Sequence, residues 1–175
     1  MDAKDILIEG FGRLPEEVHD AVAALTPEQL RWQPADGANS IGWLIWHLSR
    51  VQDSHVADLI DGEQVYVTGN WAPRFGLKPD PSDTGYAHTA GEITAVAPES
   101  AEALEDYYEA VHERTLTFVR GLTATDLDDL VDEGWDPPVT LGVRLVSVID
   151  DDAQHAGQAA YVRGILLSTR TRSEP

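Results

Sequence analysis

The residues best suited to chemistry in this sequence are two histidines and an aspartate. His47 lies in the apolar segment 43–48, and His155 follows Asp151 by four residues in a distant second segment. Residues four apart lie one above the other on a helix face, so Asp151 and His155 can reach the same point in space. With His47 from another helix, they would form a two-histidine, one-carboxylate metal site with open coordination positions.

Three consecutive aspartates leave the carboxylate ligand open. Asp150, Asp151 and Asp152 all lie about one turn before His155. At about 100° per residue, Asp151 and Asp152 lie about 40° and 60° from His155 around the helix axis, whereas Asp150 lies about 140° away. We therefore expect Asp151 or Asp152 to be the ligand, with Asp151 favoured, and the remaining aspartates to form a solvated acidic patch.

The same residues also have an ordinary structural interpretation. His47 falls on an apolar stripe with Leu44, Leu48 and Val51, and a lone histidine there is more often a hydrogen-bonded core residue than a ligand. The aspartates before His155 add weight to a metal site, because an unpartnered buried carboxylate is costly and a divalent cation is one compensation. Spacing alone leaves a metal site and a set of structural residues as equal alternatives.

The segments that carry these residues have helical periodicity. Apolar positions repeat every three to four residues up to about residue 25 and over residues 41–60, 100–121 and 141–167. No strand pattern competes strongly with them. Residues 62–98 are rich in Gly, Pro, Asp and Thr, with a short helix expected at 89–96. The pattern predicts an all-α bundle of four long helices.

Length and composition limit the possible classes of protein. The 175 residues predict one domain over residues 1–168 and a flexible polar tail over 169–175. The formal charge of -19 repels nucleic acid and anionic membrane surfaces. No apolar run is long enough to span a bilayer and no secretion signal is recognised, so we expect a cytoplasmic protein. The chain has no cysteine, so any thiol chemistry needs a thiol from a co-substrate.

Several motifs resemble those of a known family. The segment Trp-Leu-Ile-Trp-His-Leu around His47, the pattern Asp151-x-x-x-His155-x-Gly-Gln, and the segment Tyr-Val-Arg-Gly at 161–164 resemble the DinB/YfiT-like superfamily. The likeness covers nearly the whole chain. Within the superfamily it is greatest to the actinobacterial DUF664 and mycothiol-dependent transferase branch.

The resemblance implies a four-helix bundle with a long crossover between its second and third helices. It also implies a divalent metal ion held by one histidine of the second helix and two residues of the fourth. The corresponding residues here are His47, Asp151 and His155, with zinc favoured over nickel, iron(II) or manganese. Many members carry histidine where this chain has Asp151, and the mycothiol-dependent isomerases carry glutamate. Aspartate is one methylene shorter than glutamate, so the metal would lie closer to the last helix or bind less tightly.

These observations together lead to a functional hypothesis. We expect a metal-dependent S-transferase or isomerase that uses a low-molecular-weight thiol such as mycothiol on a small electrophile. A metal-dependent hydrolase and a non-catalytic metal or small-molecule binding protein are the alternatives. Trp71, Arg74 and Gln158 are candidate substrate-binding residues, and no catalytic residue is assigned. Apolar residues on exposed helix faces make a homodimer an expected assembly.

Overall fold

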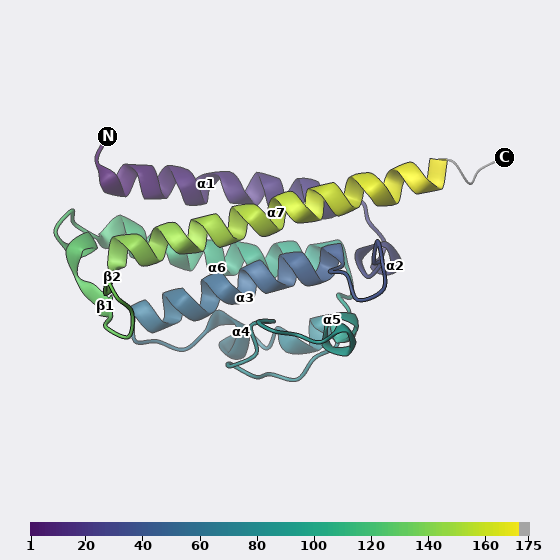
Figure 1. Ribbon diagram of the computed structural model, residues 1–175, viewed down its shortest axis with the longest axis horizontal. Coiled ribbons are helices and arrows are strands. Elements are labelled where there is room, and N and C mark those ends of the chain that lie inside the picture. The colour runs from purple at the N-terminus through teal and green to yellow at the C-terminus, as the bar shows by residue number, and fades with distance from the viewer. Residues whose placement is uncertain (172–175) are drawn as a thin grey trace.

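The protein is built around four long helices. The computed structural model describes the backbone of residues 1–171 and the side chains of residues 1–169. The long helices are α1 (Ala3–Val22), α3 (Ile41–Leu59), α6 (Ala101–Gly121) and α7 (Leu141–Thr171). The expected all-α four-helix bundle is therefore confirmed (Figure 1).

Side-chain caps fix where three of these helices begin. The side chains of Asp2, Ser40 and Ser100 each accept a hydrogen bond from the backbone N–H three residues later. Such caps satisfy N–H groups that have no partner within the helix. Because Ser40 caps α3, it sets the register in which His47 follows.

One continuous apolar core joins the four helices. In α1 the buried residues Leu7, Phe11, Leu14 and Val18 repeat every three to four positions. Helix α3 packs against both α6 and α7, and α1 covers α6 and α7 from the other side. The α3–α7 contact brings together the helix that carries His47 and the helix that carries Asp151 and His155.

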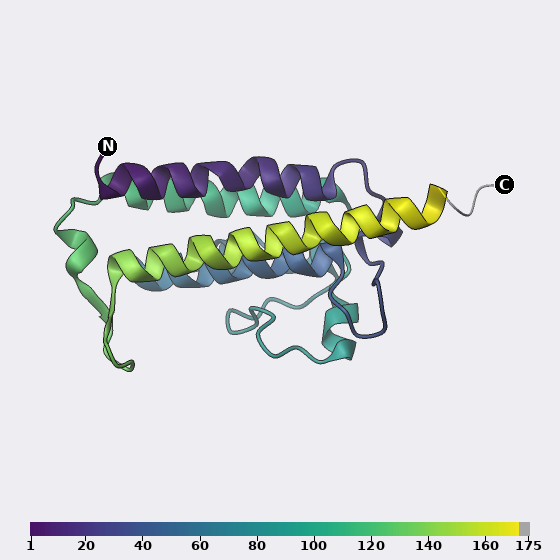
Figure 2. The ribbon, with the colours of Figure 1, turned by 45° about the horizontal axis from the view of Figure 1, so that its top comes forward.

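The connection between α3 and α6 crosses the length of the bundle. Figure 1 shows that α3 and α6 both run from the α2 end of the molecule towards the hairpin end, so the chain must return between them. The return segment contains α4 (Val65–Thr68), a 3-10 turn η1 (Ala72–Phe75) and α5 (Ala90–Ala95). Figure 2 shows it lying on the α3 side of the bundle, opposite α1. The predicted crossover is confirmed.

The remaining elements are short, and two of them differ from the expectation. They are α2 (Pro27–Leu30), the 3-10 turn η2 (Asp126–Asp128), β1 (Leu130–Asp132) and β2 (Val139–Thr140). The antiparallel β1–β2 pair was not expected, because strands of three and two residues are too short to show alternation. Its register is interrupted between Leu130 and Asp132.

The last helix is longer than its sequence pattern indicates. It continues to Thr171 rather than ending at residue 167, so residues 169–171 are helical. Residues 172–175, the rest of the segment for which a flexible tail is predicted, lie outside the described residues. Among the described helices, none combines the length and apolar character needed to span a membrane.

A buried carboxylate on α3 ties the crossover to the bundle. Asp53 accepts hydrogen bonds from the backbone N–H groups of Val65 at 2.9 Å and Tyr66 at 2.7 Å, where α4 begins. The hydroxyl of Tyr107 on α6 donates to the same carboxylate at 2.9 Å. Its counter-charge is Arg50, 3.5 Å away, and both side chains are essentially inaccessible to solvent.

Removing this carboxylate should destabilise the fold strongly. Asp53→Ala would leave the Arg50 charge buried and two backbone N–H groups without their acceptor. We expect the free energy of unfolding to fall by about 3–5 kcal/mol. Urea unfolding followed by circular dichroism measures the loss. The exposed Asp58 on the same helix is the control, and Asp58→Ala should change stability by no more than about 0.5 kcal/mol. Equal losses in the two variants would contradict this role for Asp53.

Candidate metal centre

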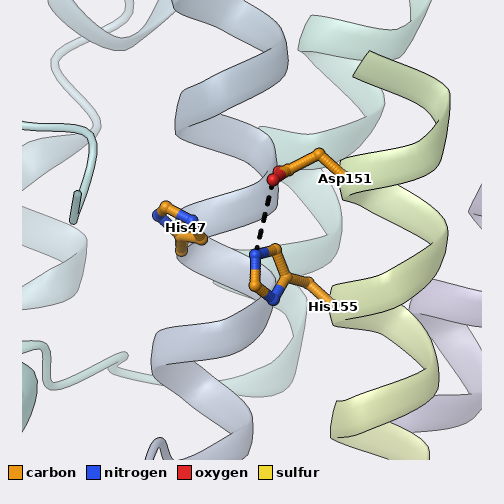
Figure 3. Close-up of side chains that lie close together, drawn as sticks. All are labelled: His47, Asp151 and His155. Atoms are coloured by element: carbon orange, nitrogen blue, oxygen red, sulfur yellow. Dashed lines mark ion pairs between the residues drawn. The ribbon is translucent and has the colours of Figure 1, made fainter. Parts of the chain in front are cut away.

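The structure brings His47, Asp151 and His155 together between α3 and α7. One potential ligand atom from each residue lies within 4.8 Å of the others, and this is the only such group among the described residues. Figure 3 shows the His47 side chain of α3 beside the Asp151 and His155 side chains, which extend from α7. The Nε2 atom of His155 is 3.5 Å from Oδ1 of Asp151. The helical spacing that predicted this cluster therefore holds in three dimensions.

A backbone carbonyl of the crossover fixes the orientation of His47. Nδ1 of His47 lies 2.5 Å from the carbonyl oxygen of Thr84. A carbonyl oxygen can only accept, so Nδ1 carries the proton and Nε2 keeps its lone pair. Burial lowers the pKa of His47, and the bond to Thr84 opposes that shift. The ring is thus kept neutral, as a metal ligand must be.

His155 is oriented through its other ring nitrogen by Gln158. Nδ1 of His155 lies 3.1 Å from Oε1 of Gln158, one turn further along α7. This contact directs Nε2 towards Asp151, in the manner by which outer-shell partners orient metal-binding histidines. Gln158 was predicted as a substrate-binding residue. The structure places it directly behind a candidate ligand, and that it also binds a substrate stays a prediction.

The donor set fits a divalent cation. Oδ2 of Asp151 is inaccessible to solvent and has no hydrogen-bond partner among the described residues. Two imidazoles and a carboxylate are common zinc ligands, and atoms around a tetrahedral zinc at about 2.1 Å are about 3.4 Å apart. The ligand atoms here lie within 4.8 Å of one another. A bound cation would satisfy this unpaired oxygen of Asp151.

The neighbouring aspartates point elsewhere. Asp150 is exposed and accepts a hydrogen bond from Gln154 at 2.7 Å. Asp152 is fully buried, and neither of its carboxylate oxygens has a hydrogen-bond partner among the described residues. Burial raises the pKa of Asp152 well above its usual range, and the charge of Asp151 raises it further. Only Asp151 shares the cluster with the two histidines.

Aromatic residues form one wall of the cluster. The Trp43 ring stacks on His47, with 4.6 Å between centroids and 13° between planes. It meets His155 edge-on at 6.4 Å. The indole N–H of Trp43 donates to Nδ1 of His88 at 3.1 Å, and Nε2 of His88 lies 2.8 Å from the Asp83 carboxylate.

His88 and Asp83 were missed by the sequence analysis. They lie in the irregular crossover, some 40 residues after His47, where no periodicity relates them to the helices. Trp43 only donates through its indole N–H, so Nδ1 of His88 accepts, and Nε2–H faces the carboxylate. The crossover thus supplies Asp83 and His88, which contact Trp43 of α3 behind the ring of His47.

The two other predicted substrate-binding residues lie in a different part of the crossover. Arg74 pairs with Glu99 at 2.6 Å and Asp106 at 3.0 Å. The Trp71 ring packs against Tyr107, with centroids 5.4 Å apart. These contacts join the crossover to α6, and the structure shows no contact of either residue with the triad. That they bind a substrate stays a prediction.

Two cavities lie beside the long helices, and neither is lined by a residue of the triad. A cavity of about 660 Å³ lies between α1 and α6 and contains none of the three residues. A cleft of about 470 Å³ lies along the same α3–α7 groove as the triad, lined by His55, Asp58, Leu59, Val131, Asp132 and Arg144. The candidate site is therefore identified by the types of its side chains rather than by the volume of a cavity. Partial exposure of Asp151 and His155, 33% and 18% of their side chains, gives the site access to solvent.

The fold and the cluster together define a helical bundle with a candidate metal site between its second and fourth long helices. Residues 11–159 match the DinB superfamily, and the chain belongs to this metal-binding superfamily. It is similar to a crystal structure of a conserved protein from Enterococcus faecalis. That similarity has a TM-score of 0.88 at 31% identity and covers 96% of this chain and 99% of the other. Among proteins with curated descriptions, none matches the sequence.

Changing each of the three aspartates to asparagine should affect zinc affinity to different extents. Asp151→Asn should weaken zinc binding at least about 100-fold, because it removes a direct ligand and outer-shell changes alone cost about 10–100-fold. Asp150→Asn and Asp152→Asn should keep affinities near that of the parent protein. Isothermal titration calorimetry measures all three. Zinc affinity that falls only in Asp152→Asn would show that the register is wrong by one residue.

The pKa of His155 should depend on the carboxylate of Asp151. The Asp151 carboxylate raises the pKa of His155 above its ordinary value of about 6.5, against the opposing effect of burial. In metal-free protein the stabilisation from this pair is complete below about pH 6.5 and is lost as pH rises through the raised pKa. NMR titration of the His155 ring should show this pKa, and Asp151→Asn should lower it. Asp150→Asn is the control, and a His155 pKa that Asp151→Asn leaves unchanged would contradict the pairing.

Proposed function

We propose that the protein binds a divalent cation, zinc in first place, through His47, Asp151 and His155, and uses it in thiol-dependent transfer or isomerisation of a small electrophile. One observation carries the proposal. Two imidazoles and a carboxylate converge within 4.8 Å, and one oxygen of that carboxylate has no other partner among the described residues. Nickel, iron(II) and manganese are alternative occupants of the same ligands.

Three protein ligands leave a coordination position for a further molecule. A divalent metal lowers the pKa of a coordinated thiol or water and so provides a nucleophile at neutral pH. The chain has no cysteine, so the thiol must be a second substrate. In the transfer, the sulfur–carbon bond forms as the bond from carbon to the leaving group breaks, and the thiol proton leaves with that group.

The residues of the chain would hold and shield the reacting centre. Asp151 supplies negative charge, and Thr84 and Gln158 hold the two imidazoles by their Nδ1 atoms. The stacked ring of Trp43 covers one side of His47. The cleft further along the α3–α7 groove offers space for the rest of a small substrate, with Arg144 held there by Asp132 and His55.

Membership of a metal-binding superfamily supports the metal part of this proposal. Mycothiol as the particular thiol rests on the resemblance of the motifs around His47 and His155 to the mycothiol-dependent branch. We also propose a homodimer. It would form through apolar residues on exposed helix faces, such as Val143 and Val146 of α7. A cytoplasmic location agrees with the need for a small-molecule thiol.

A metal-dependent hydrolase is the second candidate function. The partial exposure of Asp151 and His155 admits water to the open side of the site. Hydrolysis would proceed without any thiol, so thiol dependence separates the two activities. Metal binding without turnover would instead identify a binding protein.

A cobalt-substituted sample provides the test. Adding mycothiol near neutral pH should produce a thiolate-to-cobalt absorption band, because a coordinated thiol ionises well below its free pKa of about 8.5. Conjugation of monochlorobimane should then require both metal and thiol and should fall at least about 100-fold in His47→Ala.

His19→Ala is the matched control, because His19 is exposed and pairs with Glu105 away from the triad. It should retain both the absorption band and the activity. Absence of a spectral change and of metal-dependent conjugation with mycothiol and its analogues would reject the transferase proposal. Thiol-independent hydrolysis of a test ester would then favour the second candidate.

A further inference from the structure

The crossover approaches His47 at two consecutive residues. Thr84 contributes the carbonyl oxygen that accepts from Nδ1 of His47. Gly85 follows with a φ of +90°, and a Cβ at this position would lie 2.7 Å from Nδ1 of His47 and 3.1 Å from the Trp43 ring. Only glycine fits there without strain and without a clash. The orientation of His47 therefore depends on where this piece of irregular backbone is held.

A buried arginine holds the residues immediately before Thr84. Arg50 lies on α3 one turn after His47 and is fully buried. Its guanidinium donates to the main-chain carbonyls of Asp83 through Nε at 3.0 Å and of Pro81 through Nη2 at 3.1 Å. A longer contact of 3.4 Å reaches the carbonyl of Asp80. The buried guanidinium therefore donates hydrogen bonds to backbone carbonyl groups of residues 80–83.

The opposite side of the guanidinium is fixed to the bundle. Nη1 donates to the hydroxyl of Tyr107 at 3.3 Å and lies 3.5 Å from Asp53, while the Tyr66 ring lies 4.0 Å from Cζ. Gln64 accepts from Nη2 at 2.8 Å and itself donates to Pro81 at 3.0 Å. A planar group with five N–H donors can satisfy acceptors in several directions at once, which a lysine ammonium cannot reproduce in the same geometry.

From these contacts we infer that Arg50 is a positioning residue for the metal centre. It fixes residues 80–83, so that the next carbonyl, that of Thr84, holds His47 with Nδ1 protonated and Nε2 free to bind a metal. The irregular crossover has no regular backbone pairing at residues 80–83 that could do this instead. The inference rests on the proposed metal site for its effect on affinity, but its effect on the His47 tautomer does not require a metal.

The test compares Arg50→Lys with Tyr107→Phe. The lysine keeps the charge beside Asp53 but loses most of the donors to residues 80–83. Tyr107→Phe removes a hydroxyl from the same buried cluster on the side away from those residues. Both variants should be less stable, so a purely structural role for Arg50 would affect the metal centre equally in both.

Two readouts are measured on folded protein. The first is the side-chain ¹⁵N chemical shifts of His47 in metal-free protein, at a pH where the ring is neutral. The parent protein and Tyr107→Phe should show the Nδ1–H form, and Arg50→Lys a mixture of the two tautomers. The second is the zinc dissociation constant, which should rise about 10–100-fold in Arg50→Lys and change less than about twofold in Tyr107→Phe.

A folded Arg50→Lys variant with the parent tautomer and affinity would overturn the inference, as would equal effects in the two variants. If Arg50→Lys does not fold, the same measurements on Gln64→Leu decide, because that change loosens the hold on Pro81 and leaves the arginine in place. An unchanged tautomer in Gln64→Leu would then overturn it. If the parent protein binds no zinc, the proposed function fails, and the tautomer measurement still tests the role of Arg50.

Discussion

The buried pair of Arg50 and Asp53 is the constraint on which the geometry of the molecule depends. Because α3 and α6 run in the same direction, about 40 residues must return along the bundle with little regular structure. Asp53 holds the start of α4, and Arg50 holds the carbonyls of Asp83 and Pro81. Burial of two charges is costly, and it is offset here because nearly every polar atom of the pair has a partner. An irregular segment thereby becomes a fixed wall of the bundle.

The candidate metal centre uses that wall. His47 and His155 each have their Nδ1 atom engaged, by Thr84 of the crossover and by Gln158 of α7. The atoms left over are Nε2 of each ring and the Asp151 carboxylate, one oxygen of which has no partner among the described residues. Polar atoms in protein interiors are rarely left unpaired. The convergence of these atoms on one point supports the proposed cation site.

Helical periodicity allowed much of this to be predicted. The four long helices and the pairing of Asp151 with His155 follow from spacings within a helix, since residues three or four apart share a face. The crossover was implied by the resemblance of the motifs to a known family. The favoured aspartate of the three was also the one that the structure places with the histidines. The outer contacts could not be predicted, because Thr84, Asp83 and His88 reach His47 and Trp43 from an aperiodic segment. Arg50 and Asp53, two charges three residues apart on the apolar helix that carries His47, are the one local signal that could have pointed to the crossover contacts. The β1–β2 pair was missed because its strands are too short to show a pattern.

The central claim is that one divalent ion binds between α3 and α7 through two imidazoles and one carboxylate. X-ray absorption at the zinc edge tests it most directly, on protein purified without a metal-affinity tag and loaded with one equivalent of zinc. The account predicts nitrogen and oxygen ligands at about 2.0–2.2 Å, the multiple scattering of two imidazoles, and no sulfur. On addition of a small-molecule thiol, one sulfur at about 2.3 Å should appear. Failure to retain zinc, or a spectrum with fewer than two imidazoles, would contradict the account.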